Sequence, residues 1–123
     1  MGAPVCLEYR IEGNDFMVAG AASNNIKNTL KMLGIASDIC RRVAIITYEA
    51  EINLVIHAGG GMLQALISED HVDLVIKDEG PGIADINKAM TAGGLFHRFR
   101  GGTDAGLWRR HGPAEYKAQQ RYL

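Results

Sequence analysis

The stretch SDICRRVAIITYEAEINLVIHA, residues 37–58, is apolar almost all round, which is typical of a helix buried in a core. Three polar side chains interrupt it, namely Glu49, Asn53 and His57. Their four-residue spacing predicts that they stack on one face of a helix, one turn above another. Burying a carboxylate, an amide and an imidazole in a row is costly unless something binds them. The pattern therefore predicts a ligand, and a metal-bound polyphosphate would satisfy all three groups.

A second signal follows this helix in the sequence. Residues 72–77 read VDLVIK, a run that is typical of a buried strand, and residues 78–83 continue with DEGPGI. Gly80, Pro81 and Gly82 are turn-forming residues. We expect a glycine-bearing turn at the end of a buried strand, facing the polar side of the central helix.

Composition describes a single small domain. The chain has 123 residues, is 47% hydrophobic and has a net charge of −1, which allows one two-layer core. The near-neutral charge gives no case for direct binding to nucleic acid or to an acidic membrane. No signal peptide or membrane span is expected. Cys6 and Cys40 follow no metal or disulfide spacing, so we expect reduced thiols in or near the core of a soluble, cytoplasmic protein.

The remaining elements follow from turn residues and apolar spacing. Gly34 and the glycine triplet at residues 59–61 separate them, and Ser23 is the expected cap of the first helix. Ile26, Leu30 and Leu33 are expected on its buried side. The expected elements are a strand at residues 5–12, a strand or helix lead at 16–20, a helix from Ser23 to Met32 or Leu33, the central helix, strands at 62–68 and 72–77, and a helix at 86–90. This order predicts an α+β fold, a two-layer sandwich with a mixed, mostly antiparallel sheet and helices on one face.

The two signals resemble the N box and the G1 box of the GHKL (Bergerat-fold) ATPases, as Glu49-x-x-x-Asn53 and Asp78-x-Gly80-x-Gly82. Both boxes at this separation are more specific than either alone. Between Val18 and about Thr91 the chain is most similar to bacterial anti-sigma-factor serine kinases and stress-module switch kinases. The resemblance implies an ATP- and Mg²⁺-dependent protein serine kinase. Such a kinase phosphorylates or binds a small antagonist protein and thereby controls a sigma factor or a stress-signalling complex.

The resemblance also implies a role for each site residue. Asn53 would offer a side-chain oxygen to Mg²⁺, and Glu49 would accept the proton of the attacking serine hydroxyl or water. Asp78 would accept a hydrogen bond from the exocyclic amine of adenine. Further contacts to the nucleotide are implied for the backbone at Gly80 and Gly82, for apolar walls at Ile83 and Met90, and for His57 near the phosphates.

Each residue also has a purely structural interpretation. A glycine–proline run can be a plain turn, a buried Asn can pack a helix, and a single His can be a core or surface side chain. His71 and Lys77 are interpreted as solvated charges, and Arg41-Arg42 as an exposed pair that contacts solvent or a protein partner. Two other functions stay open: a non-catalytic regulatory binding module with impaired ATP binding, and the ATPase domain of a histidine kinase, although no phospho-acceptor His helix precedes the boxes.

The resemblance stops after Met90. The family continues with a mobile lid and a second glycine box, GYST…GxGxGLP, that wraps the phosphates at a helix N-terminus, whereas residues 93–102 here read GGLFHRFRGG. We therefore expect a truncated core at residues 1–92 and a non-family basic tail at 93–123, without the lid and the last strands. Such a sheet would have an uncovered edge, which favours pairing into a homodimer. Without the lid, ATP binding is expected to be weak or absent.

The tail also has an explanation at the level of codons. Residues 95–122 can be encoded so that the same DNA, read from the second base, gives YSTASEEVRTLGFGAGMGLPNIKRNSD. This string contains the lid and the second glycine box in order. We hypothesise that the chain from about Gly93 onward is out of frame. The alternative is a genuine basic arm for nucleic acid, in which Arg98, Arg100, Arg109, Arg110 and Arg121 alternate with Phe99, Trp108 and Tyr116.

Overall fold

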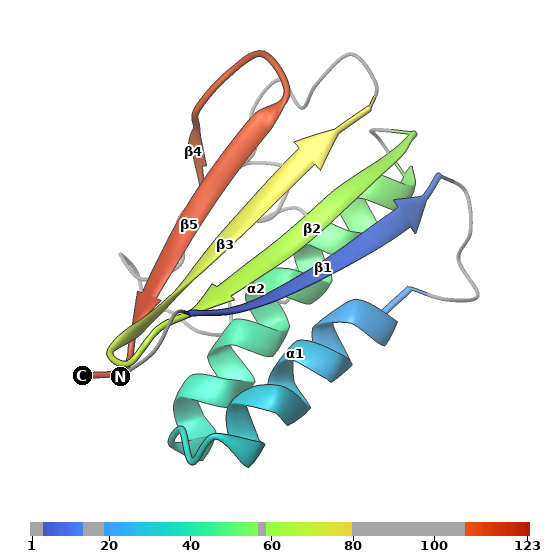
Figure 1. Cartoon of the computed structure of the whole chain (residues 1–123). Helices are drawn as coiled ribbons and strands as arrows, with labels where there is room; N and C mark the ends of the chain where they lie inside the picture. The colour runs from blue at the N-terminus through green and yellow to red at the C-terminus, as the bar shows by residue number, and fades with distance from the viewer. Residues whose placement is uncertain (1–3, 14–18, 57–58, 80–107) are drawn as a thin grey trace.

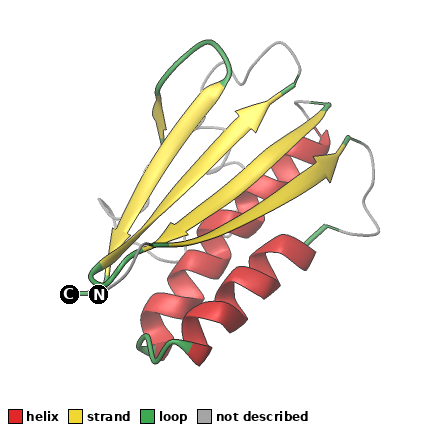
Figure 2. Cartoon of the chain, in the orientation of Figure 1, coloured by secondary structure: helices red, strands yellow, loops and turns green. Residues whose placement is uncertain are grey.

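The computed structural model describes residues 4–13, 19–56, 59–79 and 108–123. Two helices lie on one face of a sheet, which gives two layers (Figures 1 and 2). The α+β class expected from the sequence is confirmed. The elements in chain order are β1 (Val5–Glu12), α1 (Ala21–Met32), α2 (Ser37–Ile56), β2 (Gly60–Ile67), β3 (His71–Asp78), β4 (Arg109–Arg110) and β5 (Glu115–Arg121).

The sheet has five described strands in the order β1-β2-β3-β5-β4. All four described pairings are antiparallel, so the expectation of a mixed sheet is wrong for this part of the chain. The pairing of β1 with β2 extends from Val5 opposite Ile67 to Glu12 opposite Gly60. β2 and β3 follow each other directly and are joined by a short turn at residues 68–70, which favours antiparallel neighbours, whereas β1 pairs with β2 across the two intervening helices.

Side chains alternate between the two faces of the sheet, as strand geometry requires. On β3 the buried residues Val72, Leu74 and Ile76 face the helix layer, with Asp73 and Lys77 on the other face. The apolar residues of the helices are buried in the same cluster as these strand residues. The helices therefore cover this face of the sheet. The core joins both layers through Ile26, Leu30, Val43, Ile46, Ala50, Leu54, Leu63, Ala65, Val72, Leu74 and Ile76.

The first helix begins earlier than expected. It starts at Ala21, Gly20 occupies the cap position with a φ of 100°, and Ser23 lies inside the first turn. The Ser23 hydroxyl donates to the carbonyl of Gly20 at 3.1 Å. The expectation that Ser23 caps the helix is therefore wrong, because glycine adopts the left-handed conformation that this cap requires.

The end of α1 agrees with the sequence except at Leu33. Gly34, with a φ of 84°, donates its N–H to the carbonyl of Lys31 at 3.0 Å and ends the helix as expected. Leu33 was expected on the buried side, but it is 51% exposed. Because it already stands at the C-cap, its side chain leaves the apolar stripe that Ile26 and Leu30 occupy.

The expectation that the sheet lacks its last strands is wrong. Strand β5 pairs with β3 from His71 opposite Arg121 to Lys77 opposite Glu115. Its burial alternates because Tyr116, Ala118 and Gln120 face the core side between charged or polar residues, which is the pattern of a half-buried strand. The uncovered edge beside β3, from which a homodimer was expected, is therefore filled by the chain's own tail (Figure 1).

Two of the three aromatic residues of the supposed basic–aromatic arm lie in the core. Trp108 and Tyr116 are both buried, so neither ring presents a face on which a base could stack. Phe99 lies outside the described residues. The arrangement of the described tail therefore favours a role in the sheet over the nucleic-acid arm.

The thiols differ in environment. Both are free, but Cys6 is exposed and only Cys40 is buried, so the expectation of two core or near-core thiols is wrong for Cys6. Cys6 lies on β1 with its side chain on the face of the sheet opposite the helices, next to Leu7 on the helix side. In the described segments, neither helix is both long and apolar enough to cross a membrane.

Candidate functional site

Helix α2 buries the first two candidate residues. Glu49 and Asn53 are each 3% exposed, and the Asn53 Nδ2 donates to the backbone carbonyl of Glu49 at 2.9 Å. The bond joins consecutive turns of the helix and so orients the amide along one face. The prediction that both polar side chains are buried, one turn apart, is confirmed.

Asp78 is the last residue of β3 and is 8% exposed. It lies two residues beyond Ile76, so its side chain belongs to the helix-facing side of the strand. Its N–H donates to the carbonyl of Ala114 at 2.9 Å, and its cross-strand partner is Gly61. The end of β3 is thus held between β2 and the segment that leads into β5.

The following residue is held as well. The N–H of Glu79 donates to the carbonyl of Gly60 at 3.2 Å, and its carboxylate lies 2.7 Å from the Arg10 guanidinium on β1. Both side chains of this ion pair are about half exposed, so it positions the strand end more than it stabilises the fold. The start of the glycine-bearing turn therefore has a defined place in the structure.

A close contact at Gly61 connects the helix to this end of the sheet. A Cβ built on Gly61 would lie 3.1 Å from Leu54 Cδ2 and 2.2 Å from the carbonyl of Lys77. Leu54 follows Asn53 on α2, and Gly61 is opposite Asp78. The last turns of α2 therefore pack against the strand ends that include Asp78 (Figure 1), with Asn53 in the helix layer and Asp78 on the side of the sheet that faces it.

The structure describes none of the other candidate residues. The predicted helix at residues 86–90 also lies outside the described part of the chain. The candidates concerned are His57, Gly80, Gly82, Ile83 and Met90, all outside the described residues. Their roles stay predictions.

The side-chain oxygen of Asn53 is the kind of hard ligand that a magnesium ion would accept. Among the described residues there is no group of three or more His, Cys, Asp or Glu side chains that could hold a metal. Mg²⁺ usually takes one or two protein ligands and completes its shell with phosphates and waters. Asn53 is the residue that would supply such a ligand.

The sequence analysis missed Glu51, the most buried carboxylate in α2. It is 1% exposed and accepts three backbone N–H groups at the start of α1, from Gly20 at 2.9 Å, Ala22 at 3.2 Å and Ser23 at 3.0 Å. These are the donors that a helix N-terminus leaves without helical partners. A charged residue in an otherwise apolar helix was the available signal, but the partners lie far away in sequence.

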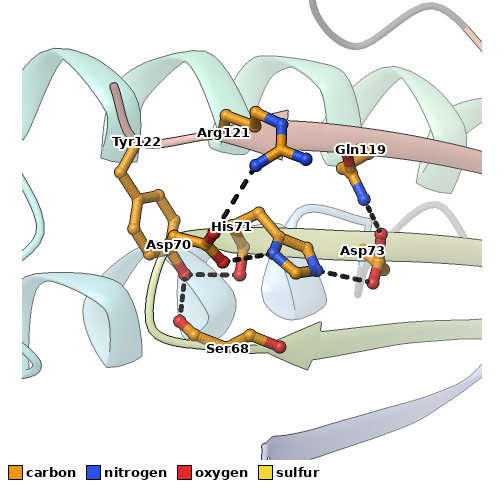
Figure 3. A network of polar contacts seen from close by, with 7 residues as sticks. All are labelled: Ser68, Asp70, His71, Asp73, Gln119, Arg121 and Tyr122. Atoms are coloured by element: carbon orange, nitrogen blue, oxygen red, sulfur yellow. Dashed lines mark hydrogen bonds and ion pairs between the residues drawn. The ribbon is translucent and has the colours of Figure 1, made fainter.

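A second polar cluster lies at the opposite end of β3, where His71 was expected to be a solvated charge. The ring is partly exposed and has two carboxylate partners (Figure 3). The ring contacts Asp70 Oδ1 through Nδ1 at 2.6 Å and Asp73 Oδ2 through Nε2 at 3.2 Å. Gln119 of β5 donates to Asp73 at 2.8 Å. The cluster therefore ties β5 to the turn between β2 and β3.

Electrostatics of this cluster follow from its two carboxylates. The hydrogen bond to Asp70, followed by the charge of Asp73, raises the pKa of His71 above its ordinary value of 6.5. The same hydrogen bond lowers the pKa of Asp70 below 3.8. Protonated His71 is thus favoured in the folded chain, far from Asp78 along the same strand.

No protein-family model matches this chain, and no curated protein is significantly similar to it. The fold and the burial of Glu49, Asn53 and Asp78 therefore carry the functional argument.

Proposed function

We propose that this chain contains the adenine and magnesium side of a Bergerat-type ATP site and derives from a protein serine kinase that regulates a sigma factor or a stress-signalling complex. One observation carries the proposal. Glu49 and Asn53 are buried one turn apart on α2, and Asp78 is buried at the end of β3 on the side of the sheet that faces the helices. A region that several buried polar side chains face is the usual place to expect a binding site.

Asn53 is assigned to the metal. Its amide is oriented by the bond from Nδ2 to the Glu49 carbonyl, so its oxygen is held in one direction along the helix. When bound, Mg²⁺ neutralises negative charge on the phosphates. The chain's own contribution is to fix one oxygen ligand on a rigid helix, which lowers the entropic cost of binding.

Glu49 is assigned as the base. A buried carboxylate near the transferred phosphoryl group can accept the proton of a serine hydroxyl from the partner protein, a role that contributes about 10²- to 10⁴-fold to the rate. The partner implied is a small antagonist protein that presents this serine. Glu49 precedes Asn53 by one turn of α2, which supports its assignment beside the metal ligand.

Asp78 is assigned to base recognition. A carboxylate accepts the exocyclic amine of adenine, whereas guanine presents an oxygen at that position and would repel it. Because Asp78 is 8% exposed, an unmatched base would leave a poorly solvated charge facing an acceptor. The site is therefore expected to prefer ATP to GTP.

The main alternative is a regulatory binding module without kinase activity. It is favoured by the sequence after Gly94, which lacks the second glycine box. A third candidate is the ATPase domain of a histidine kinase. Incubation with radiolabelled ATP and the antagonist protein from a neighbouring gene separates them: phosphoserine on the antagonist supports the kinase, binding without transfer supports the module, and phosphohistidine supports the third.

The chain itself is tested by calorimetry. We expect Mg·ATP to bind with a dissociation constant of about 1 mM or weaker, a free energy of about −4 kcal/mol, because the residues that would grip the phosphates are absent from the sequence. Micromolar affinity would contradict the account of the lid. Sequencing the coding DNA tests the frame: codons after Gly93 that do not yield the lid motif in another frame would end the frameshift hypothesis.

A further inference from the structure

An open groove runs between α1 and α2 on the solvent side of the helix layer. It encloses about 350 Å³ and is lined by Asn24 and Lys27 of α1 and by Arg41, Ala44, Ile45 and Tyr48 of α2. A second hollow of about 310 Å³ shares Lys27 and Arg41 and extends to Lys31 and Asp38. We call the two together the helix groove.

The helix groove carries a local positive charge. The cations on the two helices are Lys27, Lys31, Arg41 and Arg42, whereas Glu49 and Glu51 are buried. Asp38 is the one exposed acid on these helices, and the charged residues that line the groove, Lys27, Lys31 and Arg41 against Asp38, sum to three minus one, or +2. The whole chain has a net charge of −1. The positive charge is therefore a property of this surface and not of the protein.

These cations have no ion pairs within the described part of the chain, where the recorded pairs all involve strands and their turns. Lys27 and Lys31 are four residues apart, so both point to the same side of α1, and Arg41 faces them from α2 across the groove. Unpaired cations on both rims attract carboxylates at matching spacing.

The floor of the helix groove is apolar. Ala44 and Ile45 are half-buried there, and Tyr48 extends the floor toward Gly20. A Cβ at Gly20 would lie 3.3 Å from Tyr48 Cε1, so the glycine leaves this end open. The volume accommodates one or two side chains and not a large ligand.

We propose that the helix groove binds an acidic amphipathic helix of a partner protein. One or two apolar side chains would lie on Ala44, Ile45 and Tyr48, and carboxylates four residues apart would pair with Lys27, Lys31 and Arg41. Helix-in-groove recognition uses this combination of apolar anchors and flanking charge. The proposal does not rest on the ATP site, since none of these residues belongs to it.

The composition of the groove favours this occupant over others. The helix layer of a second copy would present Asp38 as its one exposed acid, too few carboxylates for three cations. A nucleic acid backbone would match the cations but would leave the apolar floor without a partner. An acidic helix satisfies both features.

The test uses the full chain and a fluorescein-labelled synthetic helix with Leu at i, i+3 and i+7 and Glu four residues apart, together with a matched peptide in which every Glu is Gln. We expect the acidic peptide to bind and the Gln peptide to bind at least about tenfold more weakly. Lys27→Glu and Arg41→Glu should each weaken binding of the acidic peptide about tenfold. Lys117→Glu, an equal charge change on the exposed face of β5, should leave it unchanged.

Amide chemical shifts locate the contact. Perturbations at Ala44, Ile45 and Tyr48 on addition of the acidic peptide, together with unchanged circular dichroism of the variants, support the proposal. The proposal is overturned if the acidic peptide does not bind at concentrations up to about 1 mM, or if the Gln peptide binds as tightly as the acidic one. It is also overturned if Lys117→Glu weakens binding as much as Lys27→Glu and Arg41→Glu do. Stronger groove-dependent binding of single-stranded DNA or of phosphatidylserine vesicles, or a dimer in sedimentation that Arg41→Glu dissociates, would also overturn it.

Discussion

The carboxylate of Glu51 in the C-terminal half of α2 accepts the backbone N–H of Ser23 at the start of α1, at 3.0 Å. With the bonds from Gly20 and Ala22, one buried side chain supplies the acceptors that the first turn of α1 lacks. The negative charge also lies at the positive end of the α1 dipole. The two helices that form one layer are therefore joined by a cap that comes from the neighbouring helix.

Replacing this cap tests its contribution. Glu51→Gln keeps one oxygen but removes the charge and introduces donors toward buried N–H groups, so the free energy of unfolding should fall by about 2–4 kcal/mol. Urea denaturation followed by circular dichroism measures the change. Glu12→Gln, at an exposed carboxylate with a 3.7 Å contact to Arg10, is the control and should change stability by less than about 1 kcal/mol. Equal losses of unfolding free energy in the two variants would show that Glu51 contributes no more to stability than an exposed carboxylate.

The cluster around His71 predicts a pH dependence. The pKa of His71 is raised in the folded chain, chiefly by Asp70, so its stabilising contribution is complete below its unfolded pKa of 6.5 and is lost as the pH rises through the higher folded pKa. Stability should therefore fall on the alkaline side of pH 6.5. Urea midpoints at about pH 5.5 and about pH 8.5 measure this fall.

The matched control for this effect is another histidine. His71→Gln should abolish the difference in urea midpoint between the two pH values. His111→Gln, at an exposed residue beside β4, should retain this difference. On the acid side, the lowered pKa of Asp70 predicts a contribution that is present above about pH 3.8 and is lost as the pH falls further. A His71→Gln variant with an unchanged pH profile would show that the contacts in Figure 3 have no energetic consequence.

The close contact at Gly61 predicts an intolerant glycine. In Gly61→Ala the added methyl would meet the carbonyl of Lys77 at 2.2 Å, so β2 and β3 would have to separate beside Asp78. We expect a loss of about 2 kcal/mol or more in unfolding free energy. Gly112→Ala is the control, since its Cβ would lie 3.7 Å from Glu115 Cβ, an ordinary contact. A thermal melt in which both variants match the parent chain would contradict the packing described at this end.

Glu49 is assigned to phosphate transfer and Asp78 to nucleotide binding, so a variant of Glu49 should impair transfer and leave binding intact. In the product of the restored reading frame, Glu49→Gln should keep Mg·ATP affinity within about threefold and lower phosphate transfer to the antagonist by about 10² or more, since the base is lost. Transfer is measured with radiolabelled ATP, and affinity by calorimetry. Undiminished transfer in Glu49→Gln would exclude Glu49 as the base.

Burial of Glu49 and Asn53 was predictable because their period coincides with that of the helix that carries them. The position of Asp78 at a strand end was predictable because it directly follows the strand-like run at residues 72–77, which forms most of β3. Glu51 was not, since its partners at Gly20, Ala22 and Ser23 lie 28 to 31 residues away and meet it only after the helices pack. Local patterns identify which polar residues are buried more readily than what they bind.

The strand at Glu115–Arg121 shows the opposite case. Its core side consists of Tyr116, Ala118 and Gln120, an alternation too weak in hydrophobicity to outweigh the Arg- and Gln-rich composition. What stabilises it is the ladder with β3, a long-range pairing that the sequence does not display. The prediction that Leu33 is buried was also wrong. A shift of one residue in the end of the helix decides whether a side chain remains on its apolar stripe.

The central claim is that Asn53 and Asp78 belong to one Mg·ATP site. The most direct measurement is calorimetric titration of Mg·ATP into the product of the restored reading frame and into its Asp78→Asn and Asn53→Ala variants, with Mg·GTP as the competing nucleotide. The account predicts micromolar binding of Mg·ATP, at least about 100-fold weaker binding in either variant and no detectable binding of Mg·GTP. A folded restored-frame product that binds no ATP, or that binds it equally well without the Asp78 carboxylate, would contradict the account.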